Sequence, residues 1–296
     1  MAKDLAAYQD KKRRGEIVFA AGIGVLILGI LLLVFNEGNA LETLGLIVLG
    51  IAVITMIVGG VFYSQAVNKF KTEFLKDYFS ETIENGEYYP KKGLQPQEVY
   101  ECGFLKRADR FKSYDYLSGT IDGVNFRSSD CHLQEKQVRY VTRNGKRRRK
   151  VEYVTYFKGR VFNFDFNKNI DHPIQVLERF KPQDGNRYKK VELESIDFNK
   201  KFNTYSTDSH TVFYVITPHF MESLMKIEQN HPGKIGFSFM GPKMHFAIND
   251  GRGLFYIAPF KKIDEKLVDG FKEDVDKIYN IVDDLKLNHK IFKEES

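Results

Sequence analysis

The chain has 296 residues, of which 43% are apolar and 28% are charged, and its formal net charge is +6. This balance excludes an intrinsically disordered chain, which would have fewer apolar residues and a larger net charge. The length allows one large domain or two small ones. Cys102 and Cys131 form neither a C-x-x-C redox motif nor a disulfide-rich scaffold, so we interpret them as free thiols in a reducing compartment.

Residues 17–35 and 43–62 contain no charged residue and are almost entirely apolar. At about 1.5 Å per helical residue, each would extend about 28–30 Å, which matches a hydrocarbon core about 30 Å thick. The sequence therefore predicts two membrane spans. A pair of buried core helices would need one domain to enclose both on every face, and a cleaved signal peptide would not be followed by a second span. Small residues that would permit close helix contact are Ala20 with Gly24 and Thr55 with Gly59.

The charges that flank the spans are unevenly distributed. Residues 11–14 (KKRR) precede the first span and Lys69, Lys71 and Lys76 follow the second, whereas the linker at 36–42 carries only two glutamates. Basic flanks stay on the cytoplasmic side of a membrane. We therefore predict an integral protein of the plasma membrane with both termini and the large domain in the cytoplasm.

The rest of the chain has the pattern of an α+β fold. Helical spacing continues past the second span, and β-rich text with SGTIDG and RNGK turn signals follows it. We predict an N-terminal two-helix transmembrane hairpin, a β-rich mixed cytoplasmic domain and a C-terminal amphipathic helix. The expected parts are a basic cytoplasmic N-terminus at 1–15, the hairpin at 16–63, a helical extension and linker at 64–95, the α+β domain at 96–262 and the terminal helix at 263–296. The α+β domain has one lobe, or two divided near 182–190.

Four segments give specific predictions. VFNFDFN alternates so that one strand face is buried, with Phe162, Phe164 and Phe166 on it. TPHFMESLMKIEQNHPG predicts a helix with Thr217 as its N-cap. KIGFSF and KMHFAIN predict a hairpin across Gly241-Pro242. The last segment predicts an amphipathic helix whose apolar residues are Leu267, Phe271, Val275, Ile278, Val282 and Leu285.

Three phrases in this region carry a family resemblance. FKGRVFNFDFNK (157–168), VELESIDFNKKFNTYSTDSHTVFYVITPHFMESL (191–224) and KIGFSFMGPKMHFAI (234–248) resemble an uncharacterised bacterial membrane-protein family catalogued as domain of unknown function 3137. The resemblance extends over roughly residues 95–260. It implies hydrophobic helices followed by a mixed cytoplasmic region, and it points to LemA-type membrane proteins as a partner. It implies no activity, and no site residue can be carried over from it.

The segment RYVTRNGKRRRK, residues 139–150, holds seven positive charges and no negative one, while the rest of the soluble part is close to neutral. Asn144-Gly145 between alternating residues is a strong hairpin signal. We interpret the tip as a contact for the anionic headgroups of the inner leaflet, where each Lys or Arg contributes roughly 1 kcal/mol. A solvated tip is the plainer alternative, and nucleic-acid binding is disfavoured because no motif for it is present. The candidate contact residues are Arg143, Lys146, Arg147, Arg148, Arg149 and Lys150.

No residue constellation specifies a reaction. Cys102 and Cys131-His132 match no zinc spacing, the seven histidines are scattered, and the Gly-rich NDGRG at 249–253 has the pattern of a tight turn. The sequence thus predicts no catalytic residue, no metal site and no cofactor.

Three functional classes remain. The leading hypothesis is a membrane-anchored cytoplasmic interaction module that binds a protein partner, the anionic inner leaflet or both through the basic hairpin. The second is a membrane-anchored enzyme with a site that one sequence does not reveal. The third, an accessory subunit of a transporter or channel, is disfavoured because neither span contains an ionisable residue.

Overall fold

A computed structural model describes residues 2–35, 39–143, 146–231, 233–253, 255–285 and 287, without the side chains of 2–4, 39, 40, 143, 146 and 166–168. The chain divides into two compact units. The first comprises Met1–Asp77 and Ile257–Glu273, and the second comprises Tyr78–Tyr256 and Asp274–Ser296. The chain therefore passes from one unit to the other within two helices and one loop.

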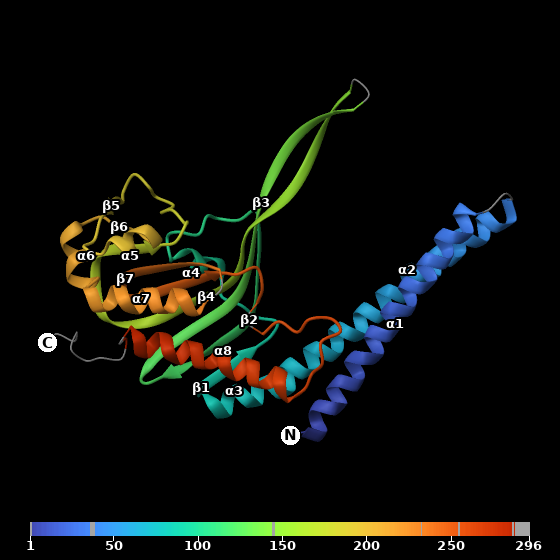
Figure 1. Cartoon of the computed structure of the whole chain (residues 1–296), viewed down its shortest axis with the longest axis horizontal. Coiled ribbons are helices and arrows are strands. Elements are labelled where there is room, and N and C mark those ends of the chain that lie inside the picture. The colour runs from blue at the N-terminus through green and yellow to red at the C-terminus, as the bar shows by residue number, and fades with distance from the viewer. Residues whose placement is uncertain are drawn as a thin grey trace. The chain divides into compact units, whose positions relative to one another are not determined.

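Two long helices dominate the first unit. They are α1 (Ala2–Val34) and α2 (Asn39–Phe70), and they lie side by side along their length (Figure 1). A π-helical turn, Lys71–Leu75, and α3, Lys76–Thr82, extend the second helix. The predicted helical continuation beyond the second span is confirmed.

Small residues repeat every seven positions where the two helices touch. Buried positions of this kind are Gly15, Gly22 and Gly29 on α1 and Gly45, Ala52, Gly59 and Ala66 on α2. A Cβ atom on Gly15 would lie 2.5 Å from the backbone nitrogen of Tyr63, and one on Gly59 would collide with the backbone of Phe19. A seven-residue repeat keeps one stripe of each helix facing its partner over two turns at a time. We call this stripe the glycine seam.

The predicted small-residue contacts are only half right. Gly59 lies in the seam, whereas a Cβ atom on Gly24 would meet nothing within 4 Å and Ala20 is exposed. Spacing by four, on which that prediction relied, marks one face of a helix but does not say which neighbour the face meets.

The outer surface of the helix pair is apolar and exposed. Both helices are long and apolar enough to cross a membrane, and only 11% and 17% of their most apolar windows are buried. A core helix of a soluble domain would be mostly buried. The two N-terminal apolar helices of the predicted fold are therefore present.

A segment at residues 257–263, which we call the return segment, packs on the charged end of this hairpin. Tyr63 donates a hydrogen bond to the carbonyl of Ile257 at 2.7 Å, and the backbone N–H of Ile263 donates to Gln9 Oε1 at 2.7 Å. Lys12 is completely buried, forms an ion pair with Glu16 and donates to the carbonyl of Lys261 at 2.6 Å. One flank of the seam is thus covered by protein.

The described strands of the second unit form one seven-stranded antiparallel sheet. Its order is β1-β2-β3-β4-β6-β5, and β7 also pairs with β4. The strands are β1 (Glu84–Tyr89), β2 (Arg110–Ile121), β3 (Val124–Arg143), β4 (Lys146–Leu177), β5 (Lys189–Val191), β6 (Asn203–Ser206) and β7 (Lys234–Asn249). The predicted α+β class is confirmed.

Two local predictions in this sheet are wrong. The segment 84–89, expected in a linker, is an edge strand paired with β2. The segment 234–249 is one strand that pairs with β4 from Gly236 to Ile248, and it is not a hairpin. Gly241 has a φ of +55°, which produces a local irregularity where β4 also shifts register, and the chain does not reverse there. The Asp122-Gly123 turn has positive φ at both residues, as the SGTIDG signal predicts.

The helices of the second unit follow the sequence patterns more closely. They are α4 (Pro96–Tyr100), α5 (Ile196–Lys201), α6 (Ser209–Val215), α7 (Pro218–Asn230) and the C-terminal α8 (Glu265–Asp284), which begins in the first unit. Thr217 caps α7 by accepting a hydrogen bond from the backbone N–H of Phe220 at 3.3 Å. The six apolar residues predicted for the last helix are all buried, so its stripe is already covered.

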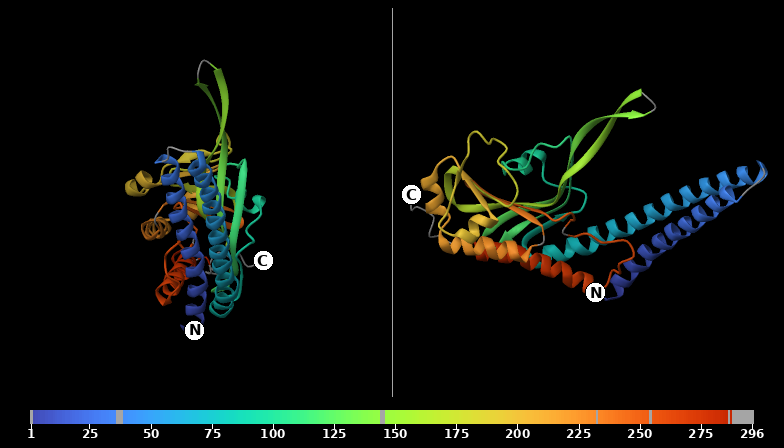
Figure 2. Two further views of the ribbon diagram at one scale, coloured as in Figure 1. Left: turned by 90° about the vertical axis from the view of Figure 1, so that its right-hand side faces the viewer. Right: turned by 45° about the horizontal axis from the view of Figure 1, so that its top comes forward.

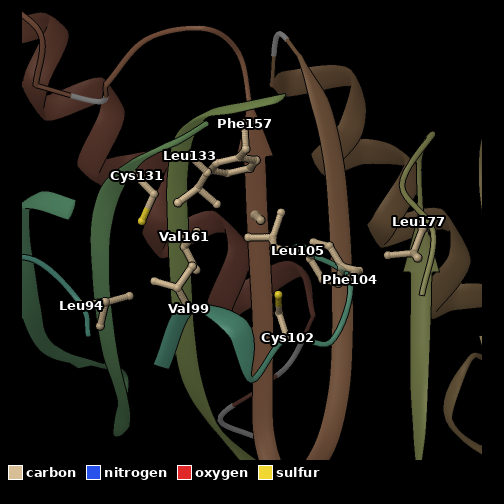
Figure 3. Close-up of a cluster of buried hydrophobic side chains, with 11 residues drawn as sticks. Leu94, Val99, Cys102, Phe104, Leu105, Cys131, Leu133, Phe157, Val161 and Leu177 are labelled. Atoms are coloured by element: carbon tan, nitrogen blue, oxygen red, sulfur yellow. The ribbon is translucent and has the colours of Figure 1, made fainter. Parts of the chain in front are cut away.

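The sheet is covered on both faces in the middle of β4. Phe162 and Phe164 are buried on one face as predicted, but Val161 and Asn163 are buried on the other. Val161 belongs to a cluster built with the segment 94–105, which includes α4, and with the two cysteines (Figure 3). The alternation in VFNFDFN therefore understates burial, because a second layer covers the face that carries Asn163. Phe166 and Asn167 lie outside the side chains that the structure describes.

The glycine seam predicts a position-specific response to larger side chains. Gly59→Ile should destabilise the helix pair by about 1–3 kcal/mol, because the new side chain collides with the backbone of α1. Gly60→Ile is the matched control, since a Cβ atom there meets nothing within 4 Å. The measurement is limited proteolysis of the full-length protein in detergent with increasing denaturant. Equal sensitivity of the two variants would contradict the seam.

Candidate functional site

The predicted basic hairpin is a long two-stranded ribbon formed by β3 and β4 (Figure 1). The register shifts between Leu133 and Gln134, and beyond that bulge ten residue pairs follow, from Gln134–Thr155 to Arg143–Lys146. At about 3.4 Å per residue this ribbon extends roughly 30 Å. Figure 2 shows it projecting from the rest of its sheet. Asn144 and Gly145, the predicted turn, lie outside the described residues.

The ribbon presents cations on both of its faces. Since directly paired residues share a face, Arg147 and Arg149 lie on one face, and Arg139, Arg148 and Lys150 lie on the other. All five side chains are exposed. The backbones of Arg143 and Lys146 pair at the end of the ladder, but the structure does not describe their side chains. The structure thus gathers the candidate contact residues onto one ribbon.

Apolar side chains are exposed beside these cations. Val138 and Val151 face each other and are each 41% exposed, and Tyr140 is 59% exposed. The guanidinium of Arg147 lies 4.5 Å from the centre of the Tyr140 ring. An isolated two-stranded ribbon is marginally stable in water. The ribbon thus exposes valine and tyrosine side chains among its arginines.

The base of the ribbon is held to the neighbouring loop. The Lys106 ammonium lies 2.5 Å from Glu135, the backbone N–H of Lys136 donates to Asp109 at 2.8 Å, and the Arg110 guanidinium lies 3.4 Å from the Tyr153 ring centre. These contacts fix the direction in which the ribbon leaves the sheet.

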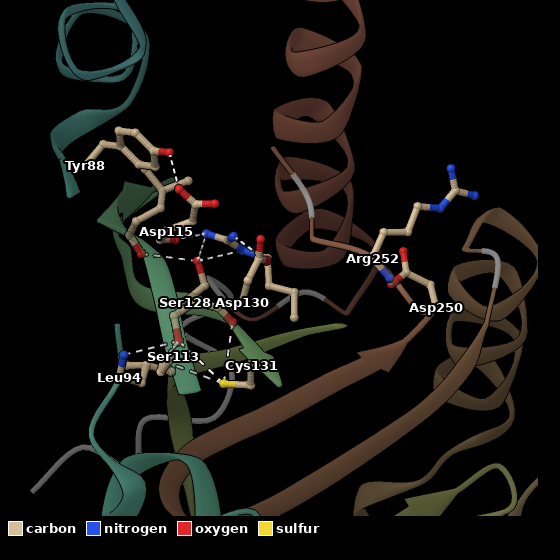
Figure 4. A network of polar contacts seen from close by, with 12 residues as sticks. Tyr88, Leu94, Ser113, Asp115, Ser128, Asp130, Cys131, Asp250 and Arg252 are labelled. Atoms are coloured by element: carbon tan, nitrogen blue, oxygen red, sulfur yellow. Dashed lines mark hydrogen bonds and ion pairs between the residues drawn. The ribbon is translucent and has the colours of Figure 1, made fainter. Parts of the chain in front are cut away.

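A second group of charges is buried at the centre of the sheet. Arg160 and Asp130 are 2% and 0% exposed, and they form an ion pair at 2.8 Å. Arg160 also donates to the carbonyl of Asp115 at 2.9 Å and to Ser128, and Tyr88 donates to the Asp115 carboxylate at 2.5 Å. Figure 4 shows this network, which we call the arginine network. Burial, together with Asp115, raises the pKa of Tyr88 and keeps the phenol protonated.

The arginine network borders a pocket of about 200 Å³ that also contains His231, Asp250, Arg252, Asp274 and Lys277. Asp250 accepts a hydrogen bond from the backbone N–H of Arg252 at 3.0 Å, while the Arg252 guanidinium extends away from the network (Figure 4). Burial raises the pKa of Asp250. Burial, with Lys277 nearby, lowers the pKa of His231 to about 4.

Most charges of this pocket are already compensated by each other. Asp274 lies 2.9 Å from Lys277, and Arg160 is paired with Asp130. An imidazole that is neutral at pH 7 and a carboxylate with a raised pKa are groups that can exchange protons. The described contacts thus define a small polar pocket.

The structure does not bring Cys102, Cys131 and His132 together as a group of metal ligands. Cys102 and Cys131 are buried free thiols in the apolar cluster, as predicted, and burial raises their pKa values to about 12 and about 11. His132 lies one residue on, and its Nε2 is 2.8 Å from Thr155 Oγ1. Among the described residues, no three His, Cys, Asp or Glu side chains are grouped so that they could hold a metal ion.

His245 is the most deeply buried histidine of the sheet. Asn163 donates through Nδ2 to the carbonyl of Glu98 at 3.2 Å, so its Oδ1 faces His245 and accepts a hydrogen bond from Nδ1–H at 2.8 Å. The Nε2 atom of His245 is buried and has no hydrogen-bond partner among the residues that the structure describes. A second proton would have no acceptor there, and burial lowers the pKa of His245 to about 4.

Sequence reasoning found the ribbon but not the pocket. The ribbon is a continuous run of charge, which can be seen in the sequence. The pocket residues Arg160, His231 and Asp250 come from separate parts of the chain. The lone charge inside the strand-like GRVFNF is the signal that could have indicated one of them. The NDGRG segment does form a bend, and its Asp250 and Arg252 line the pocket.

Residues 155–287 match the family described as protein of unknown function (DUF3137). This part of the chain is similar to that family. The matched DUF3137 segment begins at Thr155, in the first pair of the ribbon, and runs through α8. It therefore starts later and ends later than the predicted 95–260, and it covers less than half of the chain.

Other likenesses of the chain are weak. No curated protein matches the chain. The solved structure of the mycobacterial trehalose monomycolate transport factor A, TtfA, is 7% identical and has a TM-score of 0.36. It covers 68% of this chain and 88% of that chain. So low a structural likeness carries no argument about fold or function.

The buried ion pair gives a stability prediction. Arg160→Met should lower the free energy of unfolding by about 3–5 kcal/mol, because it leaves Asp130 buried without its counter-charge. Lys106→Met is the control, since its ion pair with Glu135 is exposed and contributes at most about 1 kcal/mol. Urea unfolding of the solubilised full-length protein, followed by circular dichroism, measures both. Asp130→Leu added to Arg160→Met should recover stability. A double variant as unstable as the single one would show that charge burial is not the cause.

The pKa of His245 gives a pH prediction. Above about pH 6.5 the imidazole is neutral in both the folded and unfolded states. As the pH falls towards 4 only the unfolded state takes up the proton, so the free energy of unfolding decreases by up to about 3 kcal/mol. His245→Gln should remove most of this loss, whereas exposed His219→Gln should retain it. Urea midpoints between pH 7 and 4 test this. An unchanged pH slope in the His245 variant would contradict the assignment.

Proposed function

We propose that this chain is a membrane-anchored cytoplasmic binding module whose basic ribbon contacts the anionic lipids of the inner leaflet. The observation that carries the proposal is the ribbon itself, which exposes arginines on both faces together with Val138, Tyr140 and Val151. Lysine and arginine are attracted to anionic headgroups, and tyrosine is favoured at the membrane interface. A ribbon of this composition suits a charged lipid surface better than bulk water.

The chain's other features support the same reading. Two described helices are long and apolar enough to span a membrane. Basic residues flank both spans, which supports cytoplasmic termini and a cytoplasmic large domain at the plasma membrane. Tethering raises the effective concentration of the lipid surface, so contacts of roughly 1 kcal/mol per cation would be populated.

A protein partner, including a LemA-type membrane protein, is the second reading of the same ribbon. It is supported by the family resemblance and by the ribbon's exposed strand edges, which offer unpaired backbone groups for strand addition.

The sequence contains no tryptophan, so one introduced tryptophan can serve as a fluorescent reporter. Tyr140→Trp places a single fluorophore on the ribbon of the full-length protein in nanodiscs. Nanodiscs with 30% phosphatidylglycerol should shift the emission to shorter wavelength relative to pure phosphatidylcholine, and brominated lipid should quench it. High salt should reverse both effects.

Neutralising Arg147, Arg148, Arg149 and Lys150 to glutamine should abolish the shift. The matched control neutralises Lys181, Arg187, Lys189 and Lys190, four exposed cations elsewhere on the second unit, and should leave the shift intact. If both sets act alike, the ribbon is not the contact. If the shift never appears, but a protein crosslinked to the ribbon in native membranes is lost with the ribbon set, the partner reading replaces the lipid reading.

A further inference from the structure

A groove of about 680 Å³ lies between α1 and α2 near the charged end of the hairpin. Three cations line it, namely Lys11 and Arg14 on α1 and Lys69 on α2. The remainder is lined by Gln65 and by apolar side chains, chiefly Ile17, Val18 and Phe62. Its volume falls within the range of small-molecule sites.

The polar and apolar parts of the groove meet at the boundary of the spans. Ile17 is the first residue of the first charge-free segment, and Phe62 is the last residue of the second. Lys11, Arg14 and Lys69 all lie outside those segments. With the spans in a bilayer, the cations would stand at the level of the lipid headgroups and the apolar walls at the level of the first acyl carbons.

The groove lies on the flank of the glycine seam that the return segment does not cover. At 100° per residue, Lys11, Arg14 and Val18 lie to one side of Gly15, while Gln9, Lys12 and Glu16 lie to the other. Glu16, which binds Lys12 and the backbone N–H of Phe260, is therefore turned away from the groove.

One carboxylate stands at the margin of the groove and offsets part of its charge. Glu73 lies 3.4 Å from Lys69, with both side chains about half exposed, and it accepts a hydrogen bond from Tyr8 at 2.8 Å. Three cations against one carboxylate leave the groove positive. Basic pockets between membrane helices on the cytoplasmic side are suited to phosphate-bearing lipid headgroups.

We propose that this groove binds one anionic phospholipid, with its phosphate held by Lys11, Arg14 and Lys69 and an acyl chain lying along Ile17, Val18 and Phe62. The charge complementarity selects an anionic lipid over a zwitterionic one, and the apolar walls select a lipid over a free phosphate ion. This site rests on the membrane-spanning part of the proposed function and is independent of the ribbon.

The experiment is native mass spectrometry of the full-length protein released from nanodiscs that contain equal parts of phosphatidylglycerol and phosphatidylcholine. The test variant is K11Q/R14Q/K69Q. The matched control, R13Q/K71Q/K76Q, removes three charges from the same region of the chain at positions that do not line the groove. Wild type and control should retain one bound phosphatidylglycerol, and the test variant should retain it roughly 10- to 100-fold more weakly.

Equal loss of lipid in the two triple variants would overturn the site, because lipid retention would then depend only on the overall positive charge of this region. Retention of phosphatidylcholine as readily as phosphatidylglycerol by the wild type would overturn it as well. Carbonate extraction of cell membranes separates this failure from a failure of the proposed function. If the protein resists extraction but retains no lipid, only the proposal for the groove fails. If the protein is extracted, the membrane anchor of the proposed function fails as well.

Discussion

The second unit depends on one constraint, the hydrogen bonding of a 32-residue strand. β4 pairs with β3 along its first part, with β3 and β7 in its middle, and with β7 and β6 at its end. Each change of partner sets the character of a region. Where only β3 is present, the strand is exposed and carries the basic ribbon. Where two partners and a covering layer are present, it buries phenylalanines on one face and Asn163 on the other.

Water access decides what the charged residues of this chain do. Arg160 is held by Asp130, Ser128 and the carbonyl of Asp115, and losing the Asp130 carboxylate would leave its charge buried without a counter-ion. The arginines of the ribbon keep their hydration and are available to another molecule. The cations of the groove between α1 and α2 are intermediate, since they line an apolar cavity but remain near solvent. The same residue type thus stabilises the fold in one place and offers a binding surface in another.

Periodic features of the fold could be predicted from the sequence, and features that depend on pairing could not. The two long apolar helices, the cap of α7 and the stripe of α8 are local patterns, and all three are present in the structure. The continuous β7 was mistaken for a hairpin because Gly-Pro is a common turn dipeptide, and only the pairing with β4 shows that the chain goes straight on. The ion pair of Asp130 with Arg160 joins residues 30 positions apart, and no periodic pattern in the sequence indicates such a pair. The seven-residue spacing of glycines was visible in the sequence, but its meaning required a facing helix.

The bulge between Leu133 and Gln134 has a consequence for how this protein can vary. It separates the register of the ribbon from that of the sheet, and the DUF3137 match begins only at Thr155. Two residues removed from each strand of the ribbon would shorten it while every remaining side chain kept its face. The reach of the ribbon is therefore a length that insertion and deletion can adjust in steps of about 7 Å without disturbing the core beneath it.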